Sequence, residues 1–317
     1  MIDQLKQIDP NIKENYPLKE LTTFKIGGPA KFFSVVDNEK LLIKLLKFAK
    51  TNHFKFLIIG KGSNLLISDQ GSNGLVIKLD FKEIVFKNSN VEVSADYPLN
   101  QLVALTVSKN LTGLEFATGI PGTIGGAAVG NAGAYDGQIG DIVKKVEVLD
   151  NNFQKQTLTN KALQFSYRNS ILKRNNYILL KVYLKLKKGD KLKSVQRMNK
   201  IALTRWQNHP HQPSAGSIFK NVSLSDDLIK KIQSENYQIP EKFFEYKKIP
   251  AAWLIERVGL KGKKIGGAQI SEKHANHLVN LGNAKADEVV QLISLVKMKV
   301  RDEFGIQLEE EVRYVGF

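Results

Sequence analysis

The chain has 317 residues, of which 42% are hydrophobic and 25% are charged, a composition typical of a folded protein with room for two or three domains. It contains no cysteine, which excludes disulfides, a thiol nucleophile and cysteine-ligated metals. No apolar run approaches the roughly 18 residues that a membrane span needs, and the polar N-terminus lacks a signal-peptide core. We therefore expect a cytoplasmic enzyme without membrane contact.

The charge is strongly positive, with 47 Lys and Arg against 31 Asp and Glu, a net charge of +16. The lysines occur in scattered pairs rather than along one stripe. This distribution favours compositional drift, together with attraction of an anionic small substrate, over nucleic-acid binding.

The first part of the chain is predicted to be rich in strands. We expect strands at 31–36, 55–59, 65–68, 74–79, 91–95, 143–149 and 177–187, a hairpin turn near 150–152, and helices at 38–52 and 99–109. Asp37 or Asn38 is available to cap the first of these helices.

The later part is predicted to be mostly helical. We expect helices at 193–206, 225–235, 250–258 and 285–304, a loop at 207–216 and a closing strand at 311–315. Strands first and helices later indicate an α+β protein with a domain change near residues 190–200.

Residues 113–141, here called the glycine-rich segment, combine many glycines with small residues and with apolar anchors such as Ile120, Ile124 and Ile139. Gly/Ser linkers lack such anchors, so this composition favours a ligand cradle with main-chain N–H donors over a flexible linker. The earlier loop GKGSN at 60–64 is followed by a predicted strand instead of a helix. It is therefore neither a Walker A loop nor a dinucleotide fingerprint, and a tight turn explains it almost as well as a diphosphate site.

Seven motifs in order resemble those of the UDP-N-acetylenolpyruvoylglucosamine reductase family. They are TTFKIGG (22–28), GKGSNLL (60–66), GIPGTIGGA (119–127), NAGAY (131–135), YRNS (167–170), PSAGSIFKN (213–221) and GGAQISEKHANHLVN (266–280), followed by the closing EVRYVG (311–316). Two departures are Glu310, where the family usually has proline, and the unusual run NHPHQPSAGS.

The resemblance implies an α+β fold in which two FAD-binding subdomains of the vanillyl-alcohol-oxidase/PCMH type precede a C-terminal α+β substrate-binding domain. The implied subdomains are 1–69 and 70–196, the substrate-binding domain is 197–305, and the strand at 306–317 returns to the first subdomain. It also implies bound FAD, NADPH as co-substrate, and UDP-N-acetylglucosamine enolpyruvate as the substrate that is reduced to UDP-N-acetylmuramate. A monomer is expected.

The resemblance also assigns the site residues. The implied cofactor-binding residues are Gly60, Gly62, Ser63, Asn64, Gly119, Ile120, Pro121, Gly122, Thr123, Gly125, Gly126, Asn131 and Gly133. The implied substrate-binding residues are Tyr167, Lys220, Asn221, Lys261, His274 and Asn276. The implied catalytic residues are Arg168, Ser217 and Glu311.

Each catalytic assignment has a chemical reason and an ordinary alternative. Arg168 suits a carboxylate whose charge grows during reduction, but a surface arginine in a turn is the alternative. Ser217 is a poor acid unless it meets a strong base such as an enolate, and is otherwise a loop serine. Glu311 belongs to an acidic cluster; strand alternation predicts that it shares a face with Glu309 and not with Glu310.

The histidines are also candidates for metal ligands. His274 and His277 are three residues apart, but no third ligand stands at metal spacing, so we expect no metal. His209 and His211 flank Pro210 in a predicted loop and are expected to be exposed. An FAD oxidase with another substrate, or a nucleic-acid binder, remain the competing hypotheses.

Overall fold

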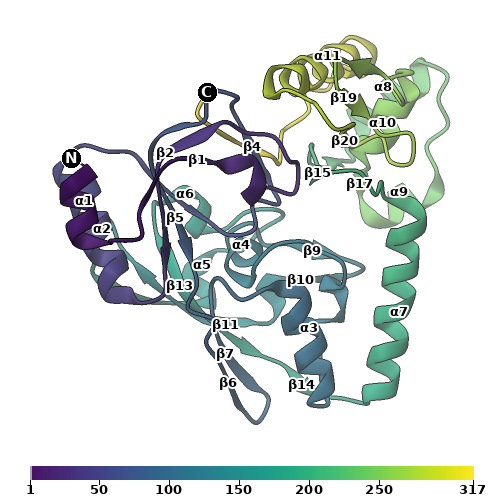
Figure 1. Cartoon of the computed structure of the whole chain (residues 1–317). Coiled ribbons are helices and arrows are strands. Elements are labelled where there is room, and N and C mark those ends of the chain that lie inside the picture. The colour runs from purple at the N-terminus through teal and green to yellow at the C-terminus, as the bar shows by residue number, and fades with distance from the viewer. Residues whose placement is uncertain (1) are drawn as a thin grey trace. The chain divides into compact units, whose positions relative to one another are not determined.

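The computed structural model describes residues 2–317, which form two compact units (Figure 1). Among the described residues, the first unit comprises 2–16, 30–61 and 72–207, and the second comprises 17–29, 62–71 and 208–317. The predicted division into subdomains 1–69 and 70–196 and a domain 197–305 stays a prediction. No helix among the described residues has both the length and the apolar composition needed to cross a membrane.

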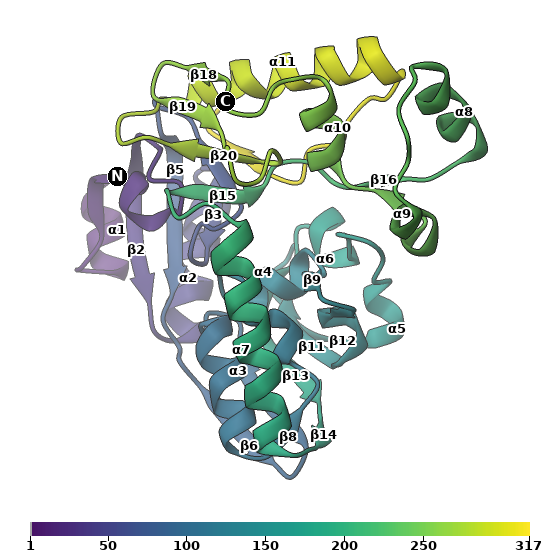
Figure 2. The same ribbon diagram turned by 90° about the vertical axis from the view of Figure 1, so that its right-hand side faces the viewer.

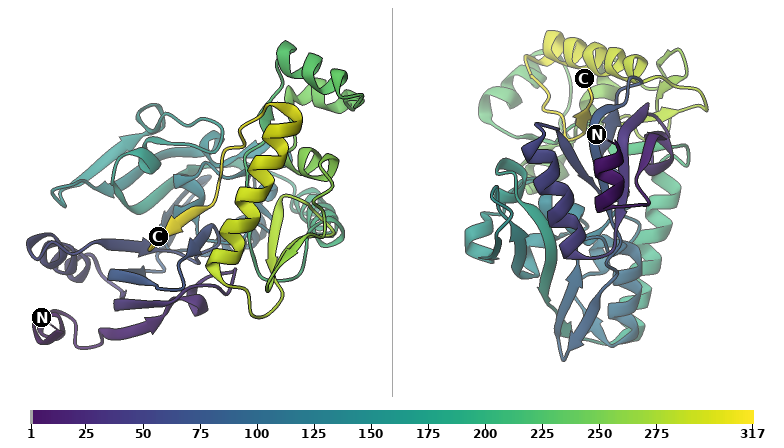
Figure 3. Two further views of the ribbon diagram at one scale, coloured as in Figure 1. Left: turned by 90° about the horizontal axis from the view of Figure 1, so that it is seen from above. Right: turned by 60° about the vertical axis from the view of Figure 1, so that its left-hand side comes forward.

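The first sheet of the first unit is largely parallel. Its strand order is β1 (Lys13–Pro17), β2 (Pro29–Val36), β5 (Ser72–Leu79) and β3 (Phe56–Ile59), with β2, β5 and β3 parallel to one another. Helix α2 (Glu39–Thr51) begins where Asn38 Oδ1 accepts the N–H of Leu41, and it packs beside α1 (Ile2–Ile8), as the purple helices in Figure 3 show. Buried leucines and isoleucines from these helices and strands form one core.

The second sheet of this unit is antiparallel. Its order is β12 (Lys155–Thr159), β11 (Val143–Leu149), β13 (Ile178–Lys185), β7 (Asn90–Ser94) and β6 (Ile84–Lys87). Strand β6 was not predicted from the sequence, because it has only four residues and none of them is fully buried. A second core lies around this sheet and the helices α3 (Leu99–Ser108) and α4 (Ile124–Val129).

The remaining elements of the first unit are short, apart from one long helix. They are the helices α5 (Asn160–Leu163), α6 (Ile171–Arg174) and α7 (Lys191–Asn208), and the strand pairs β8 (Leu111–Thr112) with β14 (Lys187–Lys188) and β9 (Gly133–Ala134) with β10 (Gly137–Gln138). Single 3-10 turns span Glu115–Ala117 and Ile139–Asp141.

The second unit contains a four-stranded sheet with a helix packed on it. Its main sheet has the order β15 (Ser214–Ser217), β20 (His277–Asn280), β19 (Ala268–Ile270) and β18 (Lys264–Ile265). Helix α11 (Ala286–Phe304) packs along β18 and β19 (Figure 2), buries the apolar side predicted from its spacing, and ends at Gly305 with φ +69°.

Smaller elements complete the second unit. They are the 3-10 turn Leu18–Leu21, helices α8 (Asp226–Ser234), α9 (Glu241–Tyr246) and α10 (Ala251–Arg257), and the strand pairs β16 (Val222–Ser223) with β17 (Lys248–Ile249) and β4 (Leu65–Ile67) with β21 (Arg313–Val315). The closing strand therefore begins at Arg313, two residues later than predicted, and it pairs in parallel with β4.

Candidate active site

The glycine-rich segment contains a short helix that the sequence analysis did not predict. Thr123 caps α4, because its Oγ1 accepts the N–H of Gly126 at 3.2 Å. A 3-10 turn precedes this helix, and the hairpin β9–β10 follows it. The segment is thus a series of tight turns held against the second sheet, which agrees with an ordered cradle and not with a linker.

Two glycines are required because the main chain approaches its neighbours closely. A Cβ at Gly125 would lie 2.6 Å from the carbonyl oxygen of Ala95. A Cβ at Gly60, at the end of β3, would lie 2.9 Å from Thr123 Oγ1. Real Cβ atoms do not tolerate such distances, so the first glycine of the GKGSN loop lies directly against the glycine-rich segment.

Most main-chain donors of this segment are used within the protein, contrary to the expected array of open amides. The N–H of Gly119 donates to Asn100 Oδ1 at 2.9 Å, and that of Gly125 donates to the Ala95 carbonyl at 2.8 Å. The N–H groups of Ile120, Ile124 and Gly126 also have acceptors in the segment or next to it. Within residues 2–317 the N–H groups of Gly122 and Thr123 have no such acceptor, so this turn offers open donors.

Asn131 has a structural role. It is buried, with φ +42°, and its Nδ2 donates to Gln138 Oε1 at 3.0 Å and to the Ser166 carbonyl at 2.9 Å. Its Oδ1 accepts the N–H of Gly140 at 2.8 Å. Both amide protons are thereby used, so Asn131 fixes the hairpin β9–β10 and does not offer its side chain as a donor to a ligand.

Arg168 is held by the same hairpin. Its Nη2 donates to the carbonyl of Gly133 at 2.9 Å, and its Cζ stands 5.3 Å from the ring centre of the half-exposed Tyr167. Arg168 has φ +55°, a conformation that non-glycine residues adopt only when the surrounding structure enforces it. A cation is therefore held in one position near the glycine-rich segment.

Glu115 is a buried carboxylate that the sequence analysis did not single out. Burial opposes its ionisation, but hydrogen bonds from Ser194 Oγ at 2.5 Å, Thr112 Oγ1 at 2.6 Å and the N–H of Gly113 at 2.8 Å together lower its pKa. Glu115 therefore attaches α7 to the start of the glycine-rich segment. A lone acidic residue within a run of small and apolar residues was the available signal.

In the second unit, the end of the GKGSN loop lies beside Glu311. Asn64 Nδ2 donates to the carbonyl of Glu311 at 3.0 Å, and the Asn64 carbonyl accepts the N–H of Arg313 at 3.0 Å. Gly62 has φ +54°, and a Cβ there would lie 2.5 Å from the carbonyl of Leu21 and 2.9 Å from the Cα of Thr22. Three motifs that are distant in sequence, at 22–28, 60–66 and 311–316, therefore meet.

Ser217 lies close in the fold to the main chain of Glu311. It is the last residue of β15 and pairs with His277 of β20. The following residue, Ile218, accepts the N–H of Glu311 at 2.7 Å. The structure thus brings the main chains of Ser217 and Glu311 close together. Glu309–Glu311 precede β21, but the antiparallel bridge between Phe219 and Glu310 aligns them with the chain after Ser217, and the predicted alternation of their side chains stays a prediction.

The glutamates differ in their partners. Lys220 pairs with Glu309, whereas Lys297 Nζ lies 2.7 Å from Glu310 Oε1. Lys261 Nζ lies 3.1 Å from Glu256. The two lysines among the predicted substrate-binding residues, Lys220 and Lys261, therefore already have carboxylate partners.

Both predicted substrate-binding asparagines support the main chain. Buried Asn276 accepts the N–H of Phe219 at 2.9 Å and donates to the Phe219 carbonyl at 2.8 Å. Asn221 Oδ1 accepts the N–H of Ala251 at 3.3 Å. Asn276 thus positions the chain that carries Ser217, and Asn221 supports the start of α10.

His274 belongs to a cluster of three imidazoles. Its ring centre is 4.7 Å from that of His277 and 5.2 Å from that of His209, which stacks on it. His209 is therefore packed and half-buried, and its predicted exposure was wrong, because the loop returns to the sheet at β15. Burial lowers the pKa of His274. Residues 2–317 contain no group of His, Asp or Glu side chains arranged to hold a metal ion.

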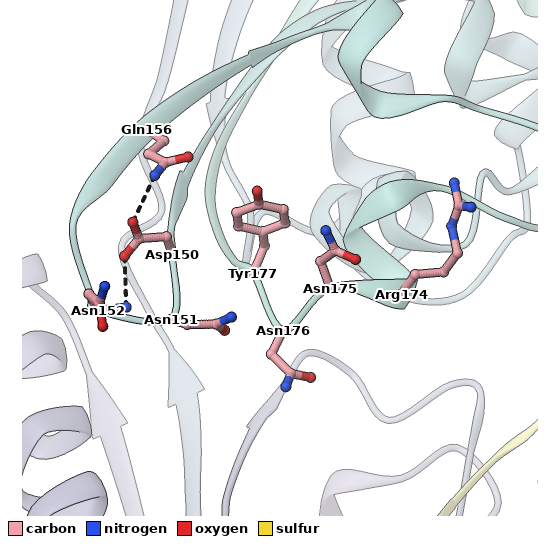
Figure 4. Close-up of a pocket in the computed structure, with 8 residues that line it drawn as sticks. All are labelled: Asp150, Asn151, Asn152, Gln156, Arg174, Asn175, Asn176 and Tyr177. Atoms are coloured by element: carbon pink, nitrogen blue, oxygen red, sulfur yellow. Dashed lines mark hydrogen bonds between the residues drawn. The ribbon is translucent and has the colours of Figure 1, made fainter.

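A further cavity of about 510 Å³ opens at the turn between β11 and β12 (Figure 4). Its lining is almost entirely polar and includes Asp150, Gln156, Arg174 and Tyr177. Asp150 accepts hydrogen bonds from the N–H of Asn152 at 2.8 Å and from Gln156 Nε2 at 2.7 Å. None of the site residues predicted from the sequence lines this cavity.

Comparison with known proteins finds a family model that matches part of each unit. Residues 30–153 match the model of the FAD binding domain, and residues 208–315 match the model of the UDP-N-acetylenolpyruvoylglucosamine reductase C-terminal domain. The open donors at Gly122 and Thr123, beside the close approach at Gly60, fit a phosphate-bearing cofactor of this kind. The fold and the site thus define an α+β flavoprotein oxidoreductase that uses FAD.

Full-length relatives make the assignment more specific. The chain is 37% identical to the UDP-N-acetylenolpyruvoylglucosamine reductase of Caldanaerobacter subterraneus subsp. tengcongensis over 100% of this chain and 98% of that protein. It is 40% identical to the enzyme of the same name from Caldicellulosiruptor bescii, over 98% and 93%. The crystal structure of the Thermus caldophilus reductase superposes with a TM-score of 0.75 at 31% identity, covering 96% of this chain and 98% of that one. The chain belongs to the UDP-N-acetylenolpyruvoylglucosamine reductase family, whose reaction serves peptidoglycan synthesis.

Proposed function

We propose that the protein uses NADPH to reduce UDP-N-acetylglucosamine enolpyruvate to UDP-N-acetylmuramate, with Ser217 as the proton donor. Family membership and the FAD binding domain support the reductase role. The observation that carries the proposed proton transfer is the 2.7 Å hydrogen bond from the Glu311 N–H to the Ile218 carbonyl, which keeps Glu311 beside Ser217.

When bound, FAD supplies the hydride, and the chain supplies its binding groups. The proposed binding residues are Gly60, Gly62, Ser63, Asn64, Gly119, Ile120, Pro121, Gly122, Thr123, Gly125, Gly126, Asn131 and Gly133. The open N–H donors of Gly122 and Thr123 suit an anionic phosphate oxygen. Gly125 and Asn131 contribute by fixing the main chain, since their polar groups are used within the protein.

Ser217 is proposed to protonate the carbon next to the carboxylate after hydride has been added to the enolpyruvyl group. An alcohol protonates only a strong base, and the carbanion formed beside the carboxylate is one. Glu311, fixed by its main chain to Ile218, is proposed to orient the reacting group and to assist proton movement. Asn276 supports this arrangement because it holds Phe219, two residues after Ser217.

Arg168 is proposed to bind the carboxylate of the enolpyruvyl group. A guanidinium is always charged and can grip a carboxylate with two donors, and negative charge on that carboxylate grows as hydride arrives. The hydrogen bond to Gly133 and the enforced φ of +55° support a preorganised cation.

The other substrate contacts are proposed at Tyr167, Lys220, Asn221, Lys261, His274 and Asn276. Among these, the buried Nδ1 of His274 has no hydrogen-bond partner within the described chain, so His274 has unused donor or acceptor capacity. The two lysines would have to exchange their glutamate partners for a substrate phosphate. A cytoplasmic location, a monomeric state and the lack of nucleic-acid or membrane partners are further parts of the proposal.

The test separates the two half-reactions in the purified holoenzyme. NADPH should bleach the flavin absorbance, and the enolpyruvyl sugar should restore it. Ser217→Ala should leave the bleaching within about twofold of wild type and slow the recovery by about 100-fold or more, the scale of a lost general acid. Equal losses in both half-reactions would exclude the proton-donor role, and bleaching that is faster with NADH than with NADPH would exclude NADPH as the preferred reductant.

A further inference from the structure

A second arginine, Arg205 of α7, lies against the glycine-rich segment. A Cβ at Gly119 would be 2.7 Å from Arg205 Cδ, so the aliphatic part of the arginine packs directly on the main chain of Gly119. Its guanidinium Cζ stands 5.5 Å from the ring centre of Tyr135. These two contacts hold the side chain in one place.

Within the part of the chain that the structure describes, the Nε of Arg205 lacks the hydrogen-bond partner that a buried donor normally has. Burial is the main cause that lowers the pKa of Arg205; Tyr135 opposes this effect, and the positive charge of Arg168 adds to it. Within residues 2–317, the charged groups that shift this pKa are therefore Tyr135 and a second cation, with no carboxylate among them.

Such an arrangement is unfavourable in the protein alone. A buried donor without an acceptor costs about 1–3 kcal/mol, and more when it is charged. Two guanidinium groups within electrostatic reach also repel each other. An anion that accepts from both groups would offset both costs, and this is common where a protein binds a carboxylate or a phosphate.

The hairpin β9–β10 connects the two arginines. Arg168 donates to Gly133 on this hairpin, and Arg205 stacks on Tyr135 in its turn. Tyr135 has φ +48°, so the turn, like Arg168, is held in a conformation that side chains rarely adopt. The hairpin therefore positions both cations relative to each other.

We propose that Arg205 is a second carboxylate-binding residue, and that its Nε and the guanidinium of Arg168 together bind the carboxylate of the enolpyruvyl group. This inference rests on the proposed function, because it takes the enolpyruvyl sugar as the ligand. Two cations also stabilise the additional negative charge that the carboxylate acquires during reduction more strongly than one cation does.

The test compares two ligands that differ in the carboxylate. Dissociation constants of the holoenzyme are measured for the enolpyruvyl sugar and for UDP-N-acetylglucosamine, which lacks that group. Arg205→Met should weaken the enolpyruvyl sugar by about 10- to 100-fold, the range expected for hydrogen bonds to a charged group. Its affinity for UDP-N-acetylglucosamine should stay within about twofold, and its thermal midpoint without ligand should equal or exceed that of wild type.

Two variants complete the test. Arg197→Met is the matched control, because Arg197 is on the same helix and donates to the Tyr135 carbonyl at 3.2 Å but is exposed. It should preserve the preference for the enolpyruvyl sugar. Arg205→Lys keeps a cation and should restore part of the preference that Arg205→Met loses.

The outcomes separate the inference from the function on which it rests. If Arg205→Met and Arg205→Lys both prefer the enolpyruvyl sugar over UDP-N-acetylglucosamine as strongly as wild type does, Arg205 does not bind the carboxylate. A lower thermal midpoint with an unchanged preference assigns Arg205 to packing and also overturns it. A wild-type protein that does not prefer the enolpyruvyl sugar, and whose flavin that sugar does not reoxidise, refutes the proposed function itself.

Discussion

Asn276 holds the main chain of Phe219 from both sides, accepting its N–H at 2.9 Å and donating to its carbonyl at 2.8 Å. Both residues are buried, and Phe219 is two residues beyond Ser217. Phe219 is bridged to Glu310 through its neighbours, and the Asn276 side chain takes the place of a second strand for the N–H and carbonyl of Phe219 itself. Asn276 is a positioning residue for the proposed proton donor.

Replacing this amide should affect both stability and catalysis. Asn276→Asp keeps the shape but removes the donor to the Phe219 carbonyl, so we expect a loss of about 2–3 kcal/mol in the free energy of unfolding. Flavin reoxidation should slow more than bleaching by NADPH, because Ser217 moves with Phe219. Denaturant unfolding and stopped-flow absorbance measure the two effects. Asn199→Asp, at an exposed position on α7, is the control. Equal stability of the two variants would mean that the hydrogen bonds between Asn276 and Phe219 do not stabilise the fold.

Glu115 should make stability depend on pH in the acidic range. Its pKa in the folded protein is lower than the ordinary value of 4.5. The ionised side chain therefore adds its full contribution to the free energy of unfolding above pH 4.5, and this contribution is lost as the pH falls from 4.5 through the folded pKa. Glu115→Gln should be less stable than wild type at pH 7 by about 1–3 kcal/mol, because the amide accepts fewer hydrogen bonds.

The measurement for Glu115 is the difference in unfolding free energy between wild type and Glu115→Gln from pH 7 to pH 3.5. That difference should shrink as the pH falls below about 4.5. The exposed Glu14→Gln should show almost no difference at any pH. A gap for Glu115→Gln that stays constant with pH would mean that its ionisation does not stabilise the fold.

The sequence predicted the parts of the fold that local patterns encode. The apolar spacing of 285–304 and Gly305 predicted α11 and its end, which are confirmed. Asp37 or Asn38 was expected to cap α2, and Asn38 is the residue that does so. The strand after GKGSN is also confirmed as β4. These elements carry their determinants within a few residues, so no tertiary information was needed.

The errors arose where distant contacts decide the structure. Thr123 and Ala95 stabilise α4 within residues whose composition predicts only turns. His209 looked exposed because its partners, His274 and His277, are more than sixty residues away in the chain. The position of Glu311 beside Ile218 likewise depends on a pairing that no local pattern contains. The family resemblance, and not periodicity, singled out Glu311.

Close approach at Gly125 should make it intolerant of any side chain. Gly125→Ala would place Cβ 2.6 Å from the Ala95 carbonyl, and a main-chain carbonyl cannot move aside cheaply. We expect the variant to displace α4 and to lose FAD, measured as the ratio of flavin to protein absorbance after purification. Gly130→Ala, at the end of the same helix, meets its nearest atom at 3.7 Å and should retain FAD. Similar flavin content in both variants would mean that FAD binding does not require glycine at position 125.

The three adjacent glutamates should differ in function although they look alike in sequence. Glu311→Gln should slow reoxidation of the flavin by the enolpyruvyl sugar by at least tenfold and leave bleaching by NADPH unchanged, because Glu311 is the acidic residue beside Ser217. Glu310→Gln removes the ion pair with Lys297 and leaves an amide oxygen to accept the hydrogen bond of Tyr314. It should change the free energy of unfolding by about 1 kcal/mol or less, without a kinetic effect. Stopped-flow absorbance of both half-reactions distinguishes the two variants. If Glu311→Gln reoxidises at the wild-type rate, the assisting group is not this carboxylate, and if Glu310→Gln is the slow variant, the role belongs to its neighbour.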